Sequence, residues 1–231
     1  MDKVNKLKEF DIEKEVKELA YKIPELNGRE EIIKDYYKYI KPMIFWLDMD
    51  IEKICDDGLI LKTKQNSQLE IKSKYIAGEF SNCIKATLIA TTIGSDISIY
   101  SKDCHNKGQY LESILLDTVG SHSVEVLIEK FHNFLAQRNL NKGLYSVNRY
   151  SPGYGDWSLS QQREILDLLK TEDKITVNSH SLLQPVKSIT AIIGWSNNPK
   201  NNNYTRIKQN NNFCNEIENC KYCNTQACKK D

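Results

Sequence analysis

The chain has 231 residues, of which 40% are hydrophobic, and its 32 Lys and Arg nearly balance its 31 Asp and Glu, for a formal net charge of +1. This balance argues against nucleic acid or an anionic membrane surface as the main partner, because both attract proteins with a basic excess. No apolar run approaches the roughly 20 residues needed to cross a bilayer, and no signal-peptide core follows the N-terminus, so we expect a cytoplasmic protein without a membrane partner.

Two amphipathic helices are predicted in the first part of the chain. Apolar residues recur at helical spacing over 12–23 and again over 29–41, and a proline follows each segment. Residues 54–61 then read as two short strands around an Asp-Gly turn. Residues 1–45 are therefore predicted to form an N-terminal helical segment.

The middle of the chain is predicted to hold a buried strand followed by helices. Residues 83–94 form an apolar, β-branched run that a glycine ends, which we interpret as a buried strand. Two helices follow. The apolar residues of the second helix recur at helical spacing: Val124, Leu127, Ile128, Phe131 and Leu135. Glu125, Glu129 and Lys130 fall on other faces of that helix.

The last part of the core is predicted to contain one more helix and one more strand. Ser158 and Gln161 predict a capping box at the start of the helix, and residues 189–195 read as a core strand. Strands and helices mix without a regular βαβ rhythm, which favours an α+β fold. The composition then changes to Asn, Lys and Gln, so residues 197–231 are predicted to be a linker and tail beyond a core of residues 46–196.

The loop over residues 149–157 brings together functional groups that suit a small ligand. Pro152 and Gly153 favour a type II turn, because Pro fixes φ at the second position and Gly supplies a positive φ at the third. Such a turn leaves backbone N–H and C=O groups facing outward. Arg149 offers a planar fork for a carboxylate, and Tyr154 offers an aromatic face and a hydroxyl. One zwitterionic or cationic ligand would use all three; the alternative is a surface turn with a solvated arginine.

Residues 149–154 include the pattern Arg-x-x-Pro-Gly-Tyr. With this motif the chain resembles the activation domain of cobalamin-dependent methionine synthases, which binds S-adenosylmethionine (AdoMet). It is similar also to short, separately encoded relatives of that domain in anaerobic bacteria. Three further segments match in the family's order, at residues 93–94, 117–125 and 183–191. The resemblance implies a bent, mainly antiparallel sheet flanked by helices, in a single domain with a cysteine-containing C-terminal tail.

The resemblance also implies roles for single residues. Arg149 would hold the AdoMet carboxylate, and the backbone around Ser151, with the turn at Pro152 and Gly153, would meet the adenine or its ribose. Tyr154 would line the pocket beside the reacting methyl group. Glu125 matches an acidic helix residue implicated in AdoMet binding; the alternative for Glu125 is a solvated helix carboxylate. The family also binds the amino group with an aspartate, for which Asp48 and Asp50 are the candidates.

The reaction implied by the resemblance is reductive methylation. Cob(II)alamin on a partner protein receives an electron from a donor such as flavodoxin or ferredoxin, and a methyl group from AdoMet traps it as methylcobalamin. The chain would position AdoMet and needs no general acid or base, so no catalytic residue is assigned. The expected partner is a cobalamin-loaded methionine synthase without its own activation domain. Two alternatives stay open: activation of another corrinoid methyltransferase, and a non-catalytic module that docks a corrinoid protein or binds a metal.

Four of the seven cysteines crowd the C-terminal end: Cys214, Cys220, Cys223 and Cys228. A Cys-x-x-Cys pair among four thiols suits a tetrahedral Zn²⁺, and also an Fe–S cluster. Zinc would be a structural clip, whereas a cluster would give electrons an entry point. A second pattern, Asp-x-His-x-x-Gly over 103–108, occurs in cobalamin carriers. We expect a polar loop there, because the chain lacks the Gly-Gly element of a carrier.

Overall fold

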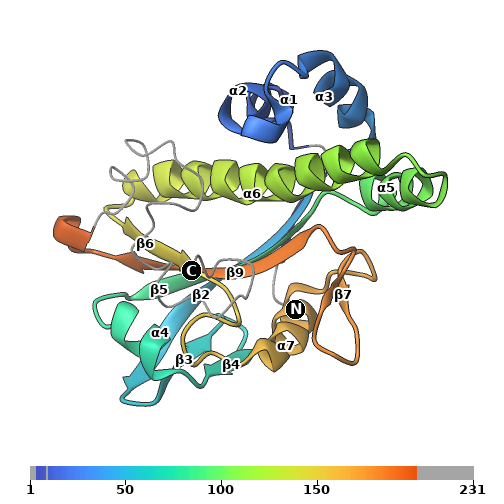
Figure 1. The fold of residues 1–231 in the computed structure, drawn as a ribbon. Helices are drawn as coiled ribbons and strands as arrows, with labels where there is room; N and C mark the ends of the chain where they lie inside the picture. Colours follow the sequence, from blue (N-terminus) through green and yellow to red (C-terminus); the bar gives the residue numbers. More distant parts are fainter. Residues whose placement is uncertain (1–3, 9, 202–231) are drawn as a thin grey trace.

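The computed structural model describes residues 4–8 and 10–201. In this part of the chain a seven-stranded sheet lies between two layers of helices, and the long helix α6 (Tyr110–Leu140) crosses one face (Figure 1). The sheet is bent and its strand pairs are antiparallel. The predicted α+β class is therefore confirmed.

The main sheet has the order β4-β3-β2-β5-β9-β6, and β1 pairs with the first part of β2. Its strands are β1 (Asn5–Lys8), β2 (Met43–Cys55), β3 (Gly58–Lys62), β4 (Gln68–Ile71), β5 (Lys85–Thr92), β6 (Tyr145–Tyr150) and β9 (Ser188–Ser196). A separate two-stranded sheet joins β7 (Thr176–Val177) and β8 (Leu183–Gln184). The strand β6 lies at one edge of the main sheet, next to β9, and leads directly into the loop that the sequence singles out.

The helices divide between the two faces of the sheet. One face carries α6, and with it α1 (Glu13–Lys17), α2 (Leu19–Lys22), α3 (Glu30–Tyr36) and α5 (Asp96–Asn106) (Figure 1). The other face carries α4 (Lys74–Glu79) and α7 (Gln162–Leu169). Four short 3₁₀ helices complete the described elements: η1 (Pro24–Leu26), η2 (Tyr37–Tyr39), η3 (Leu159–Gln161) and η4 (Pro199–Asn201).

Alternating side chains of the central strands supply two hydrophobic cores. In β2, Ile44 and Trp46 pack with α6 and the N-terminal helices, whereas Phe45 and Leu47 belong to the cluster beneath α4 and α7. Successive side chains of a strand point to opposite faces. Because helices cover both faces here, the strand is apolar on both sides and lacks the polar alternation of a half-exposed strand.

Several predicted elements are confirmed, and some boundaries were wrong. The hairpin around the Asp-Gly turn is present, with Cys55 opposite Gly58, and the predicted core strands are β5 and β9. The predicted helix over 12–23 is instead two short helices, α1 and α2. The sequence analysis missed β1, β6, α4 and the first half of β2. The proposed domain division after residue 45 stays a prediction, and β2 runs across that position. None of the helices in the described ranges is both long and apolar enough to span a membrane.

Candidate functional site

Arg149 and Glu125 meet where the edge strand β6 passes under α6. Nη2 of Arg149 donates a hydrogen bond to Oε2 of Glu125 at 3.2 Å. Nη1 lies 3.8 Å from Oε2 of Glu129, one helical turn further along α6. The Arg149 side chain is 20% exposed, against 49% for Glu125 and 38% for Glu129. Two residues that the sequence analysis assigned to one ligand are thus in contact, together with Glu129, which it placed off the apolar face of the helix.

A bulge in β6 determines that Arg149 faces α6. Ser146 pairs with Trp195 of β9, and Arg149 pairs with Ile193. Between these two pairs the chain moves three residues along β6 but only two along β9, so β6 holds one extra residue. In a regular strand, residues three positions apart point to opposite faces. The extra residue restores the orientation, and both Ser146 and Arg149 lie on the α6 face. Tyr150, the next residue, is fully buried in the opposite core.

Next to this ion pair lies a buried and neutral histidine, His132. Its Nε2 lies 2.6 Å from Oγ of Ser146, whose hydroxyl donates to the Val147 carbonyl, so Nε2 carries the proton. The ring also stacks edge-on at 6.4 Å from Trp195. Burial, with a smaller contribution from the Arg149 charge, lowers the pKa of His132 to about 3. The site therefore has one fixed cation, the guanidinium, beside a polar but uncharged ring.

Glu129 is held in a drier environment than its neighbour Glu125. Its Oε1 is buried and has no hydrogen-bond partner among the described residues, and the same is true of Nη1 of Arg149. Burial raises the pKa of Glu129 and the Glu125 charge adds to this, while Arg149 opposes it. The i to i+4 spacing from Glu125 places both carboxylates on one face of α6, a signal in the sequence that would have paired them.

The predicted turn after β6 is present. The N–H of Tyr154 donates to the Ser151 carbonyl at 3.1 Å, and Gly153 has a φ of 101°, as a type II turn requires at its third position. The expectation that its backbone groups face outward was wrong for two of them, the Gly153 N–H and the Tyr154 carbonyl. The N–H of Gly153 donates to the Trp157 carbonyl, and the N–H of Trp157 donates to the Tyr154 carbonyl. Pro152 is buried and Gly153 is exposed, so the turn lies at the surface on an apolar base.

Asp156 fixes the far end of this loop to α4. Its carboxylate accepts hydrogen bonds from the Ser73 hydroxyl and from the backbone N–H groups of Lys74 and Tyr75, the latter two at 2.9 and 3.2 Å. Burial raises the pKa of Asp156, but these hydrogen bonds outweigh it and hold the pKa below its usual value. The loop is thus tied to the first turn of a helix on the face of the sheet opposite α6.

Tyr154 packs toward that opposite face. Its ring lies edge-on, 6.4 Å from the Tyr150 ring, and the Tyr150 hydroxyl donates to Glu79 of α4. Ser151 and Tyr154 are both half-buried. Arg149 and the Tyr154 ring therefore belong to different faces of the sheet, and the loop joins them around its edge.

The two candidate aspartates lie away from Arg149. Asp48 is in register with Thr87, Ile193 and Arg149 across four strands, which puts its backbone about 14 Å from that of Arg149 at the usual strand spacing. Its carboxylate accepts from the Thr87 hydroxyl at 2.6 Å and from Arg138 of α6 at 2.9 Å. Asp50 pairs with Lys85 at 2.8 Å. Both carboxylates are thus engaged in contacts of their own.

Two matched segments of the sequence pack against each other at the other end of the sheet. Nζ of Lys187, whose side chain is only 9% exposed, lies 2.6 Å from Asp117 and 2.7 Å from the Ser121 hydroxyl on α6. The lysine chain passes over Gly120, where an added Cβ would come within 3.2 Å of it. The glycine lets β9 and α6 approach closely.

Other sequence predictions have mixed outcomes. Ser158 caps η3, but Gln161 bonds the Glu70 carbonyl and the Trp157 indole, so the capping box is only half formed. The Asp-x-His-x-x-Gly pattern does not begin in a polar loop: Asp103 and His105 lie in the last turns of α5. The cysteine cluster over 214–228 lies outside the described residues, and its metal site stays a prediction. Within the described ranges, no group of three or more His, Cys, Asp or Glu could hold a metal ion.

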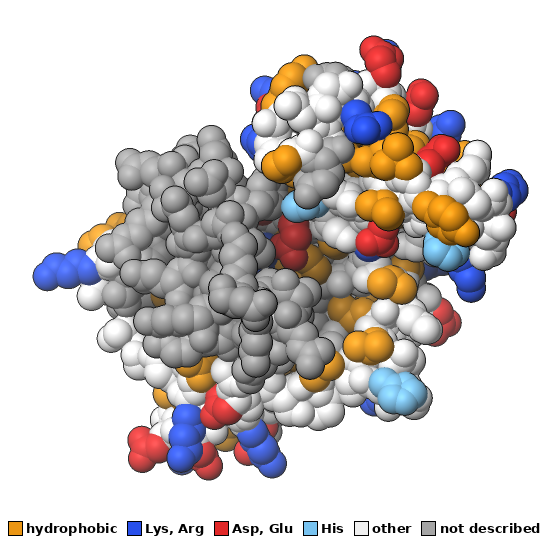
Figure 2. Space-filling view, viewed as in Figure 1, with side chains coloured by type: hydrophobic (Ala, Val, Ile, Leu, Met, Phe, Trp, Pro, Cys, Tyr) orange, Lys and Arg blue, Asp and Glu red, His pale blue; other side chains and the backbone are white. Residues whose placement is uncertain are grey.

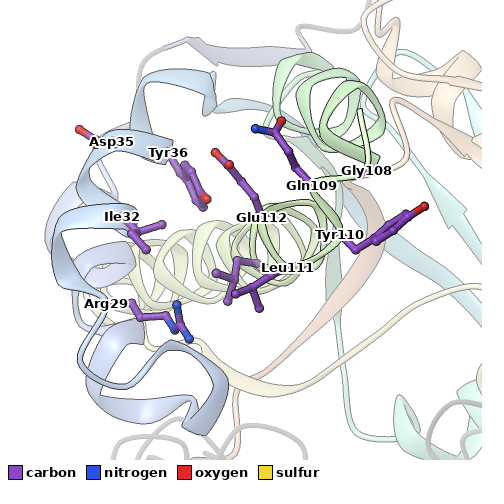
Figure 3. Close-up of a pocket in the computed structure, with 10 residues that line it drawn as sticks. Arg29, Ile32, Asp35, Tyr36, Gly108, Gln109, Tyr110, Leu111 and Glu112 are labelled. Carbon is purple, nitrogen blue, oxygen red and sulfur yellow. The ribbon is translucent and has the colours of Figure 1, made fainter. Parts of the chain in front are cut away.

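A cavity of about 650 Å³ lies between α3 and the start of α6. Figure 3 shows Arg29 and Glu112 pointing into it, whereas Asp35 points away. The Tyr36 hydroxyl donates to Glu112, and burial, together with this carboxylate, raises the pKa of Tyr36. Hydrophobic side chains are exposed around α5 and the start of α6 (Figure 2). The cavity is lined by none of the residues predicted for ligand binding, and ten residues of helix, about 15 Å, separate Leu115 from Glu125.

Comparison with solved structures identifies a similar fold. The chain is similar to the MetH reactivation domain in its crystal structure bound to AdoHcy, with a TM-score of 0.58 and 9% sequence identity, over 84% of this chain and 78% of that one. No protein-family model matches the chain, and no curated protein matches it. At this identity the likeness concerns the fold.

Proposed function

We propose that this protein binds AdoMet beside Arg149 and supports the reductive methylation of cob(II)alamin on a partner methionine synthase. The observation that carries the proposal is the contact between Arg149 and Glu125 at the edge of the sheet. These residues were assigned to one ligand from the family resemblance, and the fold that brings them together is similar to that of a domain crystallised with AdoHcy.

The charges of the site fit the amino-acid end of AdoMet. That end carries a carboxylate and an ammonium group on one carbon, so it can enter between a guanidinium and a carboxylate and leave every charge paired. Arg149 would bind the ligand carboxylate, and Glu125 would turn to the ammonium. Nη2 of Arg149, which donates to Glu125 at 3.2 Å, is the donor that the ligand carboxylate would take over.

The loop would hold the rest of the ligand. Its turn is braced internally by the bonds to Trp157 and externally by Asp156, so the Tyr154 ring and the backbone at Ser151 keep fixed positions at the end of β6. When bound, AdoMet supplies a methyl group on a positively charged sulfur. The protein's part is to orient that sulfonium and to exclude water, and neither task needs a proton donor or acceptor.

The partner and the electron source belong to the same proposal. Cobalamin would arrive on the partner protein, and a flavodoxin or ferredoxin would supply the electron. Zinc or an Fe–S cluster at Cys214, Cys220, Cys223 and Cys228 is proposed on their spacing alone. Metal analysis and the visible spectrum of anaerobically purified protein test it, and a colourless, metal-free sample would refute it.

Calorimetry with AdoMet and AdoHcy tests the binding step. We expect both to bind the wild-type protein and the affinity to fall by about 100-fold or more in Arg149→Ala, because a charge-assisted, two-pronged contact is lost. Arg163→Ala is the matched control, since Arg163 is exposed on α7. Absence of binding to the wild type would overturn the proposal and favour a docking module.

A spectroscopic assay tests the reaction. The protein is mixed with a cob(II)alamin-loaded methionine synthase that lacks its activation domain, together with a reductant and AdoMet. Appearance of the methylcobalamin spectrum, abolished by Arg149→Ala, is the expected result. Methylation of a different corrinoid protein alone would instead assign the chain to another corrinoid methyltransferase.

A further inference from the structure

We infer, on the basis of the proposed function, that Glu129 is a positioning residue that keeps Arg149 in place for the ligand, while Glu125 is the exchangeable partner that the ligand displaces. The two carboxylates of α6 would then act in sequence on one guanidinium: one remains on its inner side, and the other leaves its outer side.

The geometry separates the two carboxylates. Glu125 is the more exposed and touches Nη2 of Arg149 at hydrogen-bonding distance. Glu129 lies on the Nη1 side, where both Nη1 and its own Oε1 are buried. A ligand that arrives from solvent therefore meets the Nη2 edge and Glu125 first, and can move Glu125 aside at little cost in desolvation. The Glu129 side chain is 38% exposed, but its Oε1 is buried against the protein.

The surroundings explain why Glu129 would remain. The charged groups that act on Glu129 are Glu125 on its own helix and Arg149 on β6, and His132 lies three residues further along α6. His132 is neutral and its Nε2 is engaged with Ser146, so Arg149 is the cation that balances Glu129 among these groups. Removing the guanidinium from Glu129 would leave a partly buried carboxylate unpaired. Keeping the pair holds the guanidinium plane against α6, with its Nη2 edge turned toward the ligand.

The sequence spacing supports the same division. Glu125 and Glu129 are four residues apart on a helix, so they lie one above the other and reach the same guanidinium from successive turns. Arg149 cannot satisfy two carboxylates of α6 and a ligand carboxylate equally, since its hydrogen-bond donors lie in one plane. The 3.8 Å separation from Glu129 is an ion pair and the 3.2 Å contact with Glu125 is a hydrogen bond. Only the Glu125 contact competes directly with the ligand for a donor.

A panel of three ligands distinguishes positioning from direct binding. AdoHcy carries both groups of the amino-acid end, its 2-oxo analogue keeps the carboxylate and lacks the ammonium, and decarboxylated AdoHcy keeps only the ammonium. The affinity of each is measured by calorimetry for wild type, Glu125→Gln and Glu129→Gln. Glu31→Gln, an exposed residue on α3, is the control substitution.

The two variants should give opposite patterns. Glu125→Gln should weaken AdoHcy by about tenfold and leave the 2-oxo analogue within about twofold, because only the ammonium contact is lost. Glu129→Gln should weaken AdoHcy and the 2-oxo analogue by the same factor, about tenfold, and leave the decarboxylated analogue unchanged. If Glu129→Gln fails to fold in a thermal melt, Glu129→Asp replaces it, and the same pattern is expected.

Other results distinguish failure of the inference about Glu129 from failure of the proposed function. If Glu129→Gln changes no affinity, or weakens only ligands with an ammonium group, then Glu129 does not position Arg149 and the inference is wrong while the proposed function stands. If wild-type protein binds neither AdoMet nor AdoHcy, the proposed function fails and the inference fails with it.

Discussion

Ser146 and Arg149 are separated by an odd number of positions in β6, yet both side chains point at α6 and touch it, through His132 and Glu125. The bulge between them is the reason. If the same residues formed a regularly paired strand, one of these side chains would point into the core that contains Tyr150.

Deletion of Asn148 should therefore preserve ligand binding. The shortened strand has Ser146 and Arg149 two positions apart, so regular pairing keeps Ser146 opposite Trp195 and Arg149 opposite Ile193, with both side chains on the α6 face. We expect AdoHcy affinity in calorimetry to stay within about tenfold of wild type, a loss of no more than about 1.4 kcal/mol. Asn148→Ala, which keeps the length of the strand, should stay within about threefold of wild type. Loss of binding in a deletion variant that still folds in a thermal melt would contradict this account of the bulge.

His132 should make the protein less stable in mild acid. Burial lowers the pKa of His132 from 6.5 to about 3. Below pH 6.5 the His132 ring is therefore protonated in the unfolded chain but stays neutral in the native state. The free energy of unfolding should fall as the pH drops from 6.5 toward 3, by up to about 1.4 kcal/mol per pH unit. Urea denaturation at pH 7, 6 and 5 measures this slope. His132→Gln should reduce it, and an unchanged slope in that variant would contradict the assignment.

Asp156→Asn should loosen the loop from α4. The pKa of Asp156 is lowered in the native state, so its contribution to stability is present above the pKa of the unfolded chain and is lost as the pH falls through the lowered native value. At neutral pH we expect Tm to drop by roughly 2–4 °C, as for loss of a helix cap. The difference from wild type should shrink in acid. Asp57→Asn, in the exposed turn of the β2–β3 hairpin, should leave Tm unchanged.

Gly155 should not tolerate a side chain. Its φ is 57°, and an added Cβ would lie 2.8 Å from Cγ of Tyr75 and 2.9 Å from its Cβ. These atoms sit at the base of the ring and cannot move freely, so Gly155→Ala should cost about 1–3 kcal/mol in urea denaturation. Gly78 offers the contrast, because it lies in α4 with no atom within 4 Å of an added Cβ. Gly78→Ala should stabilise the protein by up to about 1 kcal/mol. Equal effects at the two positions would refute this account.

The parts of the fold that the sequence revealed are those in which one physical pattern dominates. Residues 83–94 are mainly apolar and β-branched, and they contain β5. The first half of β2 carries apolar side chains into both cores, so neither alternation nor a helical period marks it. Strand β6 was missed because its bulge breaks the period of two on which strand recognition depends.

The candidate site divides in the same way. The Pro-Gly turn follows from two backbone preferences and was predicted correctly, while the internal bonds to Trp157 depend on a residue beyond the turn. The contact of Arg149 with Glu125 requires the edge strand β6 to pass under α6. Local sequence patterns do not predict this tertiary arrangement. Glu129 lies off the apolar face of its helix, and this pattern does not show that one of its oxygens is buried.

The loop after β6 is attached to two separate cores: Arg149 belongs to the layer of α6, and Asp156 belongs to the layer of α4. A ligand held between these attachments would couple local opening of one layer to that of the other. Amide hydrogen exchange in α4 and in the middle of α6, two segments on opposite sides of the sheet, should then slow together when the ligand binds. Ligand binding at the sheet edge would then stabilise the layer of α4 and the layer of α6 at the same time.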